Sequence, residues 1–206
     1  MKYRSRTQHQ QTFRPVVVVL SNSILPLWYI QKVYETRQPN FQLDIDEVVL
    51  ELDKAYARCK KLAKGIFKNV IWIIDVEPLT MVEQNKGKGR RETIAKLQAM
   101  FEELNPMTVV KVVINNPSFE VWLQLHYEGI SMALETTSQT VHTALQRLIP
   151  GYAPEESFYH DNENIFIKTK DKLSTAAIHA NSLMEPDFPD LKYARTMMPV
   201  VMSLFE

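Results

Sequence analysis

Two acidic residues, Asp75 and Glu77, directly follow the apolar run at residues 70–74. A continuous apolar run is typical of a strand buried on both faces, and α/β proteins place their sites at the carboxyl ends of such strands. Acids at positions i and i+2 point to the same side while the chain is extended, and Pro78 favours an extended Glu77. Asp75 and Glu77 are therefore candidate catalytic residues and candidate ligands of Mg²⁺ or Mn²⁺, a class of cation that takes carboxylate oxygens. The alternative is a solvated strand end.

A second apolar run, at residues 109–114, leads to a third acidic candidate, Glu120. Asn115 and Asn116 are expected to end this strand, and Pro117 suits the first turn of a helix. This places Glu120 in the first helical turn at the carboxyl edge of the sheet, where it is a candidate catalytic residue. An acid that only favours the start of the helix through the dipole is the simpler alternative.

Asn116 and His126 flank Glu120 and are candidate substrate-binding residues. His126 falls four residues after Trp122 on the predicted helix, so a histidine satisfied within the helix is the alternative. None of the five histidines lies in an H-E-x-x-H or an i, i+4 pair, which argues against a zinc site.

A basic tract at residues 84–93 follows the first two acids and carries two glycines and four cations. The cations are Lys86, Lys88, Arg90 and Arg91. Ammonium and guanidinium groups neutralise phosphate without reading bases, so this tract is a candidate phosphate clamp of the substrate-binding site. It lacks the P-loop pattern, and a solvated loop is the alternative interpretation.

The composition indicates an ordinary soluble protein. The 206 residues include 45% hydrophobic and 23% charged residues and have a net charge of zero, so no overall charge steers the chain to nucleic acid. The single cysteine, Cys59, excludes an internal disulfide and fits a cytoplasmic location. The apolar run at residues 15–20 is too short to cross a membrane, and the N-terminus does not resemble a signal peptide.

Strand and helix patterns alternate along the chain and predict an α/β fold with a mostly parallel sheet and right-handed crossovers. The predicted strands are residues 16–20, 70–74 and 109–114. The predicted helices are residues 26–34, 47–68, 92–104, 137–148, 172–184 and 195–205. We expect a basic tail at residues 1–14 and a single domain at 15–206, whose C-terminal part is helical from about residue 130.

Four stretches resemble motifs of the RloB family in the same order. They are NNPSFEVWLQLHYE at 115–128, VIWIIDVE at 70–77, LIPGY at 148–152 and, loosely, YARTMMPVVMSL at 193–204. RloB-like proteins are small bacterial proteins linked to restriction and phage-defence loci. The resemblance implies a three-layer fold similar to the Toprim domain. It also implies a divalent-metal-dependent nuclease that cleaves RNA or DNA phosphodiesters, with nucleic acid and a protein from a defence operon as partners and oligomerisation possible.

One motif of the family is missing. RloB-like and Toprim proteins typically carry a glutamate just past the first strand, in a stretch similar to E-G-E-K-T-E-P. This chain has LSNSILP at residues 20–26, so every acid and the lysine of that stretch are absent, and its polar side chains are those of serine and asparagine. Those side chains cannot act as a carboxylate base, although Glu120 or Glu83 are candidates for the third carboxylate. The alternative function is therefore a catalytically degenerate Toprim-like module that binds a partner protein or nucleic acid in a defence complex.

Overall fold

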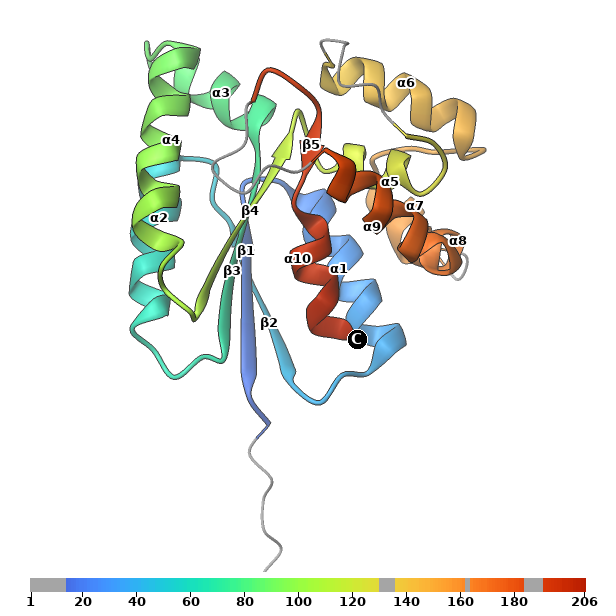
Figure 1. Ribbon diagram of the computed structural model, residues 1–206, viewed down its shortest axis with the longest axis horizontal. Coiled ribbons are helices and arrows are strands. Elements are labelled where there is room, and N and C mark those ends of the chain that lie inside the picture. Colours follow the sequence, from blue (N-terminus) through green and yellow to red (C-terminus); the bar gives the residue numbers. More distant parts are fainter. Residues whose placement is uncertain (1–13, 130–135, 162–163, 184–190) are drawn as a thin grey trace, which may run out of the picture.

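The computed structural model describes residues 14–129, 136–161, 164–183 and 191–206. A five-stranded sheet in the order β2-β1-β3-β4-β5 forms its centre (Figure 1). The strands are β1 (Val16–Ser21), β2 (Gln42–Val48), β3 (Asn69–Asp75), β4 (Val110–Asn116) and β5 (Arg195–Thr196). The neighbours from β2 to β4 pair in parallel, and β5 pairs antiparallel with β4. The predicted mostly parallel α/β sheet is confirmed.

Helices cover both faces of the sheet, as a three-layer fold requires (Figure 1). One face carries α2 (Leu52–Ala63), α3 (Val76–Gln84) and α4 (Arg90–Leu104). The other carries α1 (Ile24–Arg37), α5 (Glu120–Leu125) and α10 (Met198–Met202). The remaining helical segments are α6 (Ser138–Leu148), α7 (Glu156–His160), α8 (Ile165–Thr169), η1 (Lys170–Lys172), α9 (Leu173–Ser182) and η2 (Ser203–Phe205). The part after α5 is thus predominantly helical, as predicted.

Alternating burial explains the continuous apolar strands. Val17 and Val19 of β1 join the core on the α1 side, whereas Val18 and Leu20 join the core under α2 and α4. Successive side chains of a strand point to opposite faces, so a strand covered on both faces is mostly apolar, with polar residues mainly at its ends. The same logic applies to β3 and to most of β4, which are buried along their length.

Two predicted helices are wrong in part. Residues 42–48 of the sequence form the edge strand β2, so the helix expected at 47–68 is only Leu52–Ala63. The strand is half-exposed and rich in acids, and its pairing with β1 outweighs the low strand propensity of those acids. The helix expected at 195–205 instead begins with β5, because Arg195 and Thr196 complete the sheet beside β4.

The expected end of the third predicted strand is also wrong. Asn115 and Asn116 belong to β4 and pair with neighbouring strands, so they extend the strand instead of ending it. A cis peptide bond joins Asn116 to Pro117, and α5 begins only at Glu120. The predicted basic tail at residues 1–14 lies, apart from Arg14, outside the described residues.

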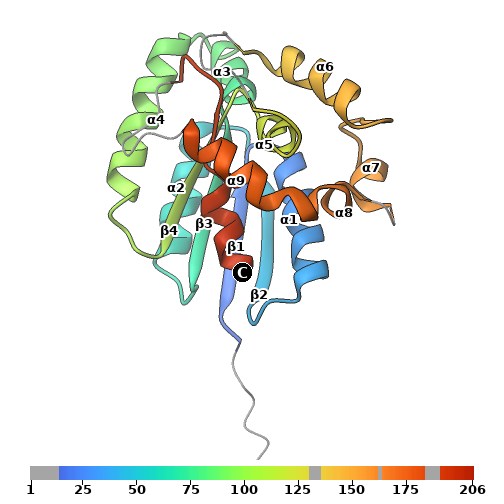
Figure 2. The ribbon, with the colours of Figure 1, turned by 45° about the vertical axis from the view of Figure 1, so that its right-hand side comes forward.

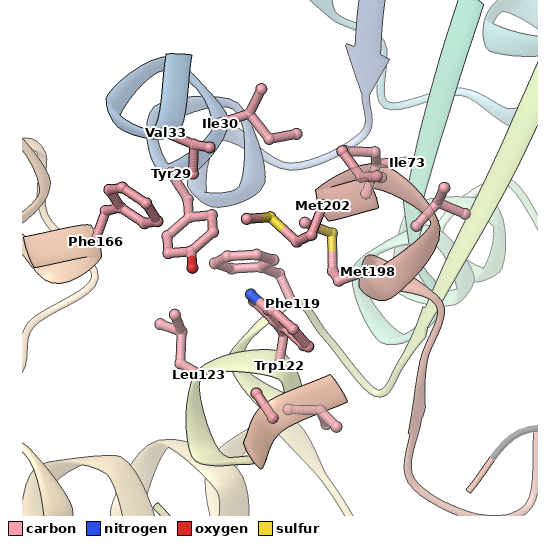
Figure 3. Close-up of a cluster of buried hydrophobic side chains, with 14 of the residues drawn as sticks. Tyr29, Ile30, Val33, Ile73, Phe119, Trp122, Leu123, Phe166, Met198 and Met202 are labelled. Atoms are coloured by element: carbon pink, nitrogen blue, oxygen red, sulfur yellow. The ribbon is translucent and has the colours of Figure 1, made fainter. Parts of the chain in front are cut away.

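Trp122 anchors α5 to the sheet and to α1 (Figure 3). Its side chain is fully buried beside Phe119, in the same cluster as Tyr29 and the methionines of α10. The rings of Tyr29 and Phe119 lie 5.3 Å apart between centroids. This packing fixes the short helix that carries Glu120, because all six residues of α5 are buried.

We predict that Trp122→Ala lowers the free energy of unfolding by ~3–5 kcal/mol, because truncation leaves a cavity in a packed core. Urea denaturation followed by circular dichroism measures this loss. Ile66→Ala is the matched control, since Ile66 is 92% exposed and its truncation is expected to change stability by less than about 0.5 kcal/mol. Equal losses in the two variants would contradict the anchoring role of Trp122.

Candidate functional site

Asp75 ends β3 at the carboxyl edge of the sheet, where the side chain of Asn22 holds its backbone. The Asn22 Oδ1 atom accepts a hydrogen bond of 2.8 Å from the Asp75 N–H, and Asn22 Nδ2 donates one of 2.9 Å to the Asp75 carbonyl. Asn22 lies just past β1, in the stretch where the family resemblance places an acid. Asn22 therefore ties the ends of β1 and β3 together.

The carboxyl group of Asp75 is held by the neighbouring strand. Asn115 Nδ2 donates a 3.0 Å hydrogen bond to Asp75 Oδ1, and Thr196 Oγ1 donates one of 2.7 Å to Asn115 Oδ1. Asp75 is only 1% exposed. Burial raises its pKa to about 6, although contacts with Asn115, the Phe119 N–H and Ser23 lower it, and the charge of Glu120 raises it further. Asp75 thus resists ionisation more than a solvated acid does.

Glu77 does not share the extended geometry expected for it. The chain turns into α3 at Val76, so Glu77 lies in the first helical turn. Pro78 is compatible with this turn because its missing N–H would have no partner inside the helix. The carboxylate of Glu77 instead accepts a 2.7 Å hydrogen bond from the backbone N–H of Ser138, the first residue of α6. The prediction that Asp75 and Glu77 point to the same side of an extended strand is therefore wrong.

Glu120 is buried, with 7% exposure, and is bound by side chains from beyond α5. Its Oε1 atom accepts a 2.8 Å hydrogen bond from the Tyr152 hydroxyl and lies 3.0 Å from His142 Nδ1. Burial raises the pKa of Tyr152 far above its ordinary value, so the phenol is neutral and donates. Sequence reasoning missed His142 and the role of Tyr152; only the position of Tyr152 in the LIPGY motif gave a signal.

The lysines of the basic tract are bound in ion pairs. Lys86 Nζ lies 2.8 Å from Glu51 and 3.3 Å from Glu83, and Lys88 Nζ lies 2.5 Å from Glu83. Burial acts to raise the pKa of Glu83, but the two lysines outweigh burial and hold that pKa below its ordinary value. Glu83 therefore balances the lysines of the tract, and the described structure gives it no contact with Asp75 or Glu77.

A cleft beside the end of β4 brings two of the predicted substrate-binding residues together, Arg90 and Asn116. Its volume is about 440 Å³, and its lining consists of Arg90, Ile94, Asn116, Thr136, Thr137, Leu191 and Lys192. Asn116 Nδ2 donates to the carbonyls of Leu191 and Tyr193, at 3.1 and 2.6 Å, and so fixes one wall of the cleft. Arg90 is the first residue of α4 and donates to the Leu191 carbonyl at 3.4 Å.

Two other predicted substrate-binding residues lie outside the lining of this cleft. Arg91 is exposed at the start of α4. His126 is buried at the end of α5, donates from Nδ1 to the Trp122 carbonyl at 2.8 Å and packs on the Trp122 ring. Burial lowers the pKa of His126 to about 4, so the imidazole is neutral near pH 7. Nδ1 thus bonds within the helix, as the alternative interpretation expects, whereas Nε2 is buried and has no hydrogen-bond partner among the described residues.

The acids as placed do not fit the metal pair expected from the sequence. In the described ranges there is no group of three or more His, Cys, Asp and Glu side chains arranged to hold a metal ion. Asp75 is bound to Asn115, Glu77 to the start of α6, and Glu120 to Tyr152 and His142. The Mg²⁺ or Mn²⁺ site at Asp75 and Glu77 stays a prediction.

The family is shown by comparison with known proteins. The model of the RloB-like protein family matches residues 6–203, so the chain belongs to the RloB-like family. No curated protein and no solved structure gives a significant match. Within the described ranges, no helix combines the length and apolar character needed to span a membrane.

We predict that Asp75→Asn changes the pH dependence of stability. The folded-state pKa of about 6 lies above the ordinary value of 3.8, so the protonated carboxyl stabilises the fold at low pH and this contribution is lost as the pH rises through 6. The loss amounts to about 3 kcal/mol for a fully buried group. The stability of wild type minus that of Asp75→Asn should thus grow by this amount from about pH 7 to pH 4, as urea unfolding measures.

The titration of His126 also changes the stability of the wild type with pH, so the effect of Asp75 must be measured as a difference between wild type and Asp75→Asn. The lowered pKa of His126 means that stability is lost as the pH falls from the ordinary value of 6.5 toward about 4, which opposes the trend from Asp75. The two trends partly cancel in the wild-type curve but not in the difference curve. A difference between wild type and Asp75→Asn that is flat with pH would contradict a protonated, buried Asp75.

Proposed function

We propose that this RloB-like chain is a nucleic-acid-binding module of a phage-defence complex, which holds phosphate in the cleft beside β4 and no longer cleaves it. The observation that carries the proposal is the meeting of Arg90, Lys192 and Asn116 in one cleft at the carboxyl edge of the sheet. Open α/β sheets bind their ligands at this edge.

The chemistry of the cleft suits a phosphate group. Arg90 presents a guanidinium with five N–H donors, of which the bond to Leu191 uses one. Arg90 is also the first residue of α4, so the positive end of the helix dipole and the first backbone N–H groups of α4 lie near the cleft. Lys192 adds positive charge to the lining, and Thr137 adds a hydroxyl. These groups recognise backbone phosphates without selecting bases.

The loss of cleavage is supported by the use of each acid in the fold. Asn22 lies in the stretch where the family resemblance expects a glutamate, and its side chain bonds to both the N–H and the carbonyl of Asp75. An amide neither takes up a proton as a base nor supplies negative charge to a cation. The remaining candidates, Glu77 and Glu120, are bound by groups of the protein itself.

A metal-dependent nuclease is the second candidate, and one observation favours it. The negative charge of Glu120 contributes to the raised pKa of Asp75, so the two carboxyl groups lie within electrostatic reach of each other at the edge of the sheet. Two carboxylates in such a position are a common feature of sites that hold a divalent cation. In this candidate, Asp75 and Glu77 are the ligands and Glu120 shapes the site.

We predict that Arg90→Gln weakens the binding of nucleic acid by the same factor for different sequences. Removal of a phosphate contact should also lower the slope of log affinity against log salt by about 1. Fluorescence anisotropy measures both quantities when labelled single-stranded RNA, single-stranded DNA and duplex DNA, each in two unrelated sequences, are titrated over a series of KCl concentrations in EDTA.

Two variants serve as controls for Arg90→Gln. Arg37→Gln removes an equal charge from the end of α1, outside the cleft, and should leave the salt slope unchanged. Lys88→Gln should have a smaller effect than Arg90→Gln, because Lys88 already neutralises Glu83. The proposal fails if the wild-type chain binds none of the three nucleic acids, or if Arg90→Gln behaves like Arg37→Gln.

A further inference from the structure

A pocket of about 440 Å³ lies between α9, α10 and the end of α1. Sites for small molecules have volumes of about 300–1,000 Å³. Helix α9 contacts α10, and η2 contacts α1, so these elements enclose the pocket (Figure 2). The pocket shares no lining residue with the cleft beside β4. It is therefore a separate site, and what it binds does not depend on the proposed function.

The inner part of the pocket is apolar. Its lining includes Trp122, Met202 and Phe205, all of which belong to the buried core on this side of the sheet. Ile178 of α9 continues the apolar lining to the surface, where it is 68% exposed. Ligand pockets are lined mainly by apolar and aromatic side chains, which take the place of water around the apolar part of a ligand. The pocket therefore suits a molecule with an apolar body.

The exposed part of the lining carries two cations, Arg37 at the end of α1 and Lys170 in η1, and one acid, Glu206. Within the described ranges, neither cation forms an ion pair with an acid. Lys88, by contrast, is neutralised by Glu83. The charges of Arg37 and Lys170 are thus available to an anion, and a guanidinium can bind a carboxylate through two parallel hydrogen bonds.

We propose that this pocket binds a small organic carboxylate with an apolar body. The body lies against Trp122, Met202 and Phe205, and the carboxylate binds Arg37 and Lys170 at the surface. The apolar lining supplies affinity by removing the body of the ligand from water, whereas the two cations select for negative charge. A neutral molecule of the same shape satisfies only the first of these requirements, and a small polar anion only the second.

The test is the binding of anilinonaphthalene sulfonate (ANS) to the full chain without nucleic acid. ANS is an aromatic anion whose fluorescence rises in apolar surroundings, so it reports occupancy of the pocket. Octanoate and naphthoate are the competing carboxylates, and they distinguish an aliphatic body from an aromatic one. Octanol has an apolar body without the charge, and acetate has the charge without the body. We expect octanoate, naphthoate or both to displace ANS at concentrations where octanol and acetate leave it bound.

Two pairs of variants locate the binding. Arg37→Gln and Lys170→Gln should each weaken ANS binding about fivefold, as the loss of one exposed ionic contact predicts. The control is Lys61→Gln, which removes an exposed charge from α2 on the other face of the sheet. Ser174→Phe places a ring in the pocket from an exposed position of α9 and should weaken binding about tenfold or more. Its control is Thr175→Phe, the next residue of α9, which is exposed outside the lining.

Thermal melting by circular dichroism checks that each variant is folded; if Ser174→Phe melts early, the comparison of Arg37→Gln and Lys170→Gln with Lys61→Gln decides. The proposal is overturned if wild type does not bind ANS, if the charge variants bind it as tightly as Lys61→Gln, or if octanol competes as well as the carboxylates. Because the cleft beside β4 shares no lining residue with this pocket, a failure of the proposed function is seen separately, in the anisotropy measurements.

Discussion

The side chain of Asn22 bound to the backbone of Asp75 is the contact on which the carboxyl edge of the sheet depends. It begins a chain of hydrogen bonds that runs from Asn22 to Asp75, from Asp75 to Asn115, and from Asn115 to Thr196. Each member lies at or next to the end of a different strand, so the chain of bonds crosses the sheet from β1 to β5. All four residues are buried. Linked hydrogen bonds in a low-dielectric interior polarise one another and are thereby strengthened.

This arrangement decides what the acids of the family motif do in this chain. A carboxylate that can bind a divalent cation is accessible to solvent and has other oxygen ligands, such as a second carboxylate, beside it. Asp75 is instead enclosed by amide and hydroxyl groups, in a setting where burial favours the protonated form. Arg90 lies one strand further along, in the cleft that it shares with Asn116. The cleft of the proposed function is thus separate from the carboxyl group of Asp75.

The parts of the fold that the sequence predicts are those with local causes. The strands β1, β3 and β4 are apolar on both faces, and α6 begins at a threonine that caps it, so their positions follow from neighbouring residues. The edge strand β2 and the short β5 form through pairing with distant partners, and neither has an apolar run of its own. Propensity alone therefore misplaces both.

In the candidate site too, the sequence predicts the features that have local causes and misses the contacts between distant residues. The sequence predicts the positions of Asp75, at the end of a strand, and of Glu120, in the helix after the next strand. It names Arg90 and Asn116 as separate candidates and does not predict that one cleft contains both. The contact of Glu120 with His142 spans 22 residues, and that of Glu77 with Ser138 spans 61, so no local pattern reports either contact. The turn of Glu77 into α3 was missed because proline is compatible both with an extended chain and with a first helical turn.

Cleavage of labelled RNA and DNA by the wild-type chain in MnCl₂ or MgCl₂, with Asp75→Asn in parallel, distinguishes two roles of Asp75. Among the described residues, Asp75 belongs to a hydrogen-bonded framework and not to a working metal site. We therefore expect the nucleic acids to stay intact with either cation and either protein. Metal-dependent cleavage by wild type that Asp75→Asn abolishes would contradict this expectation.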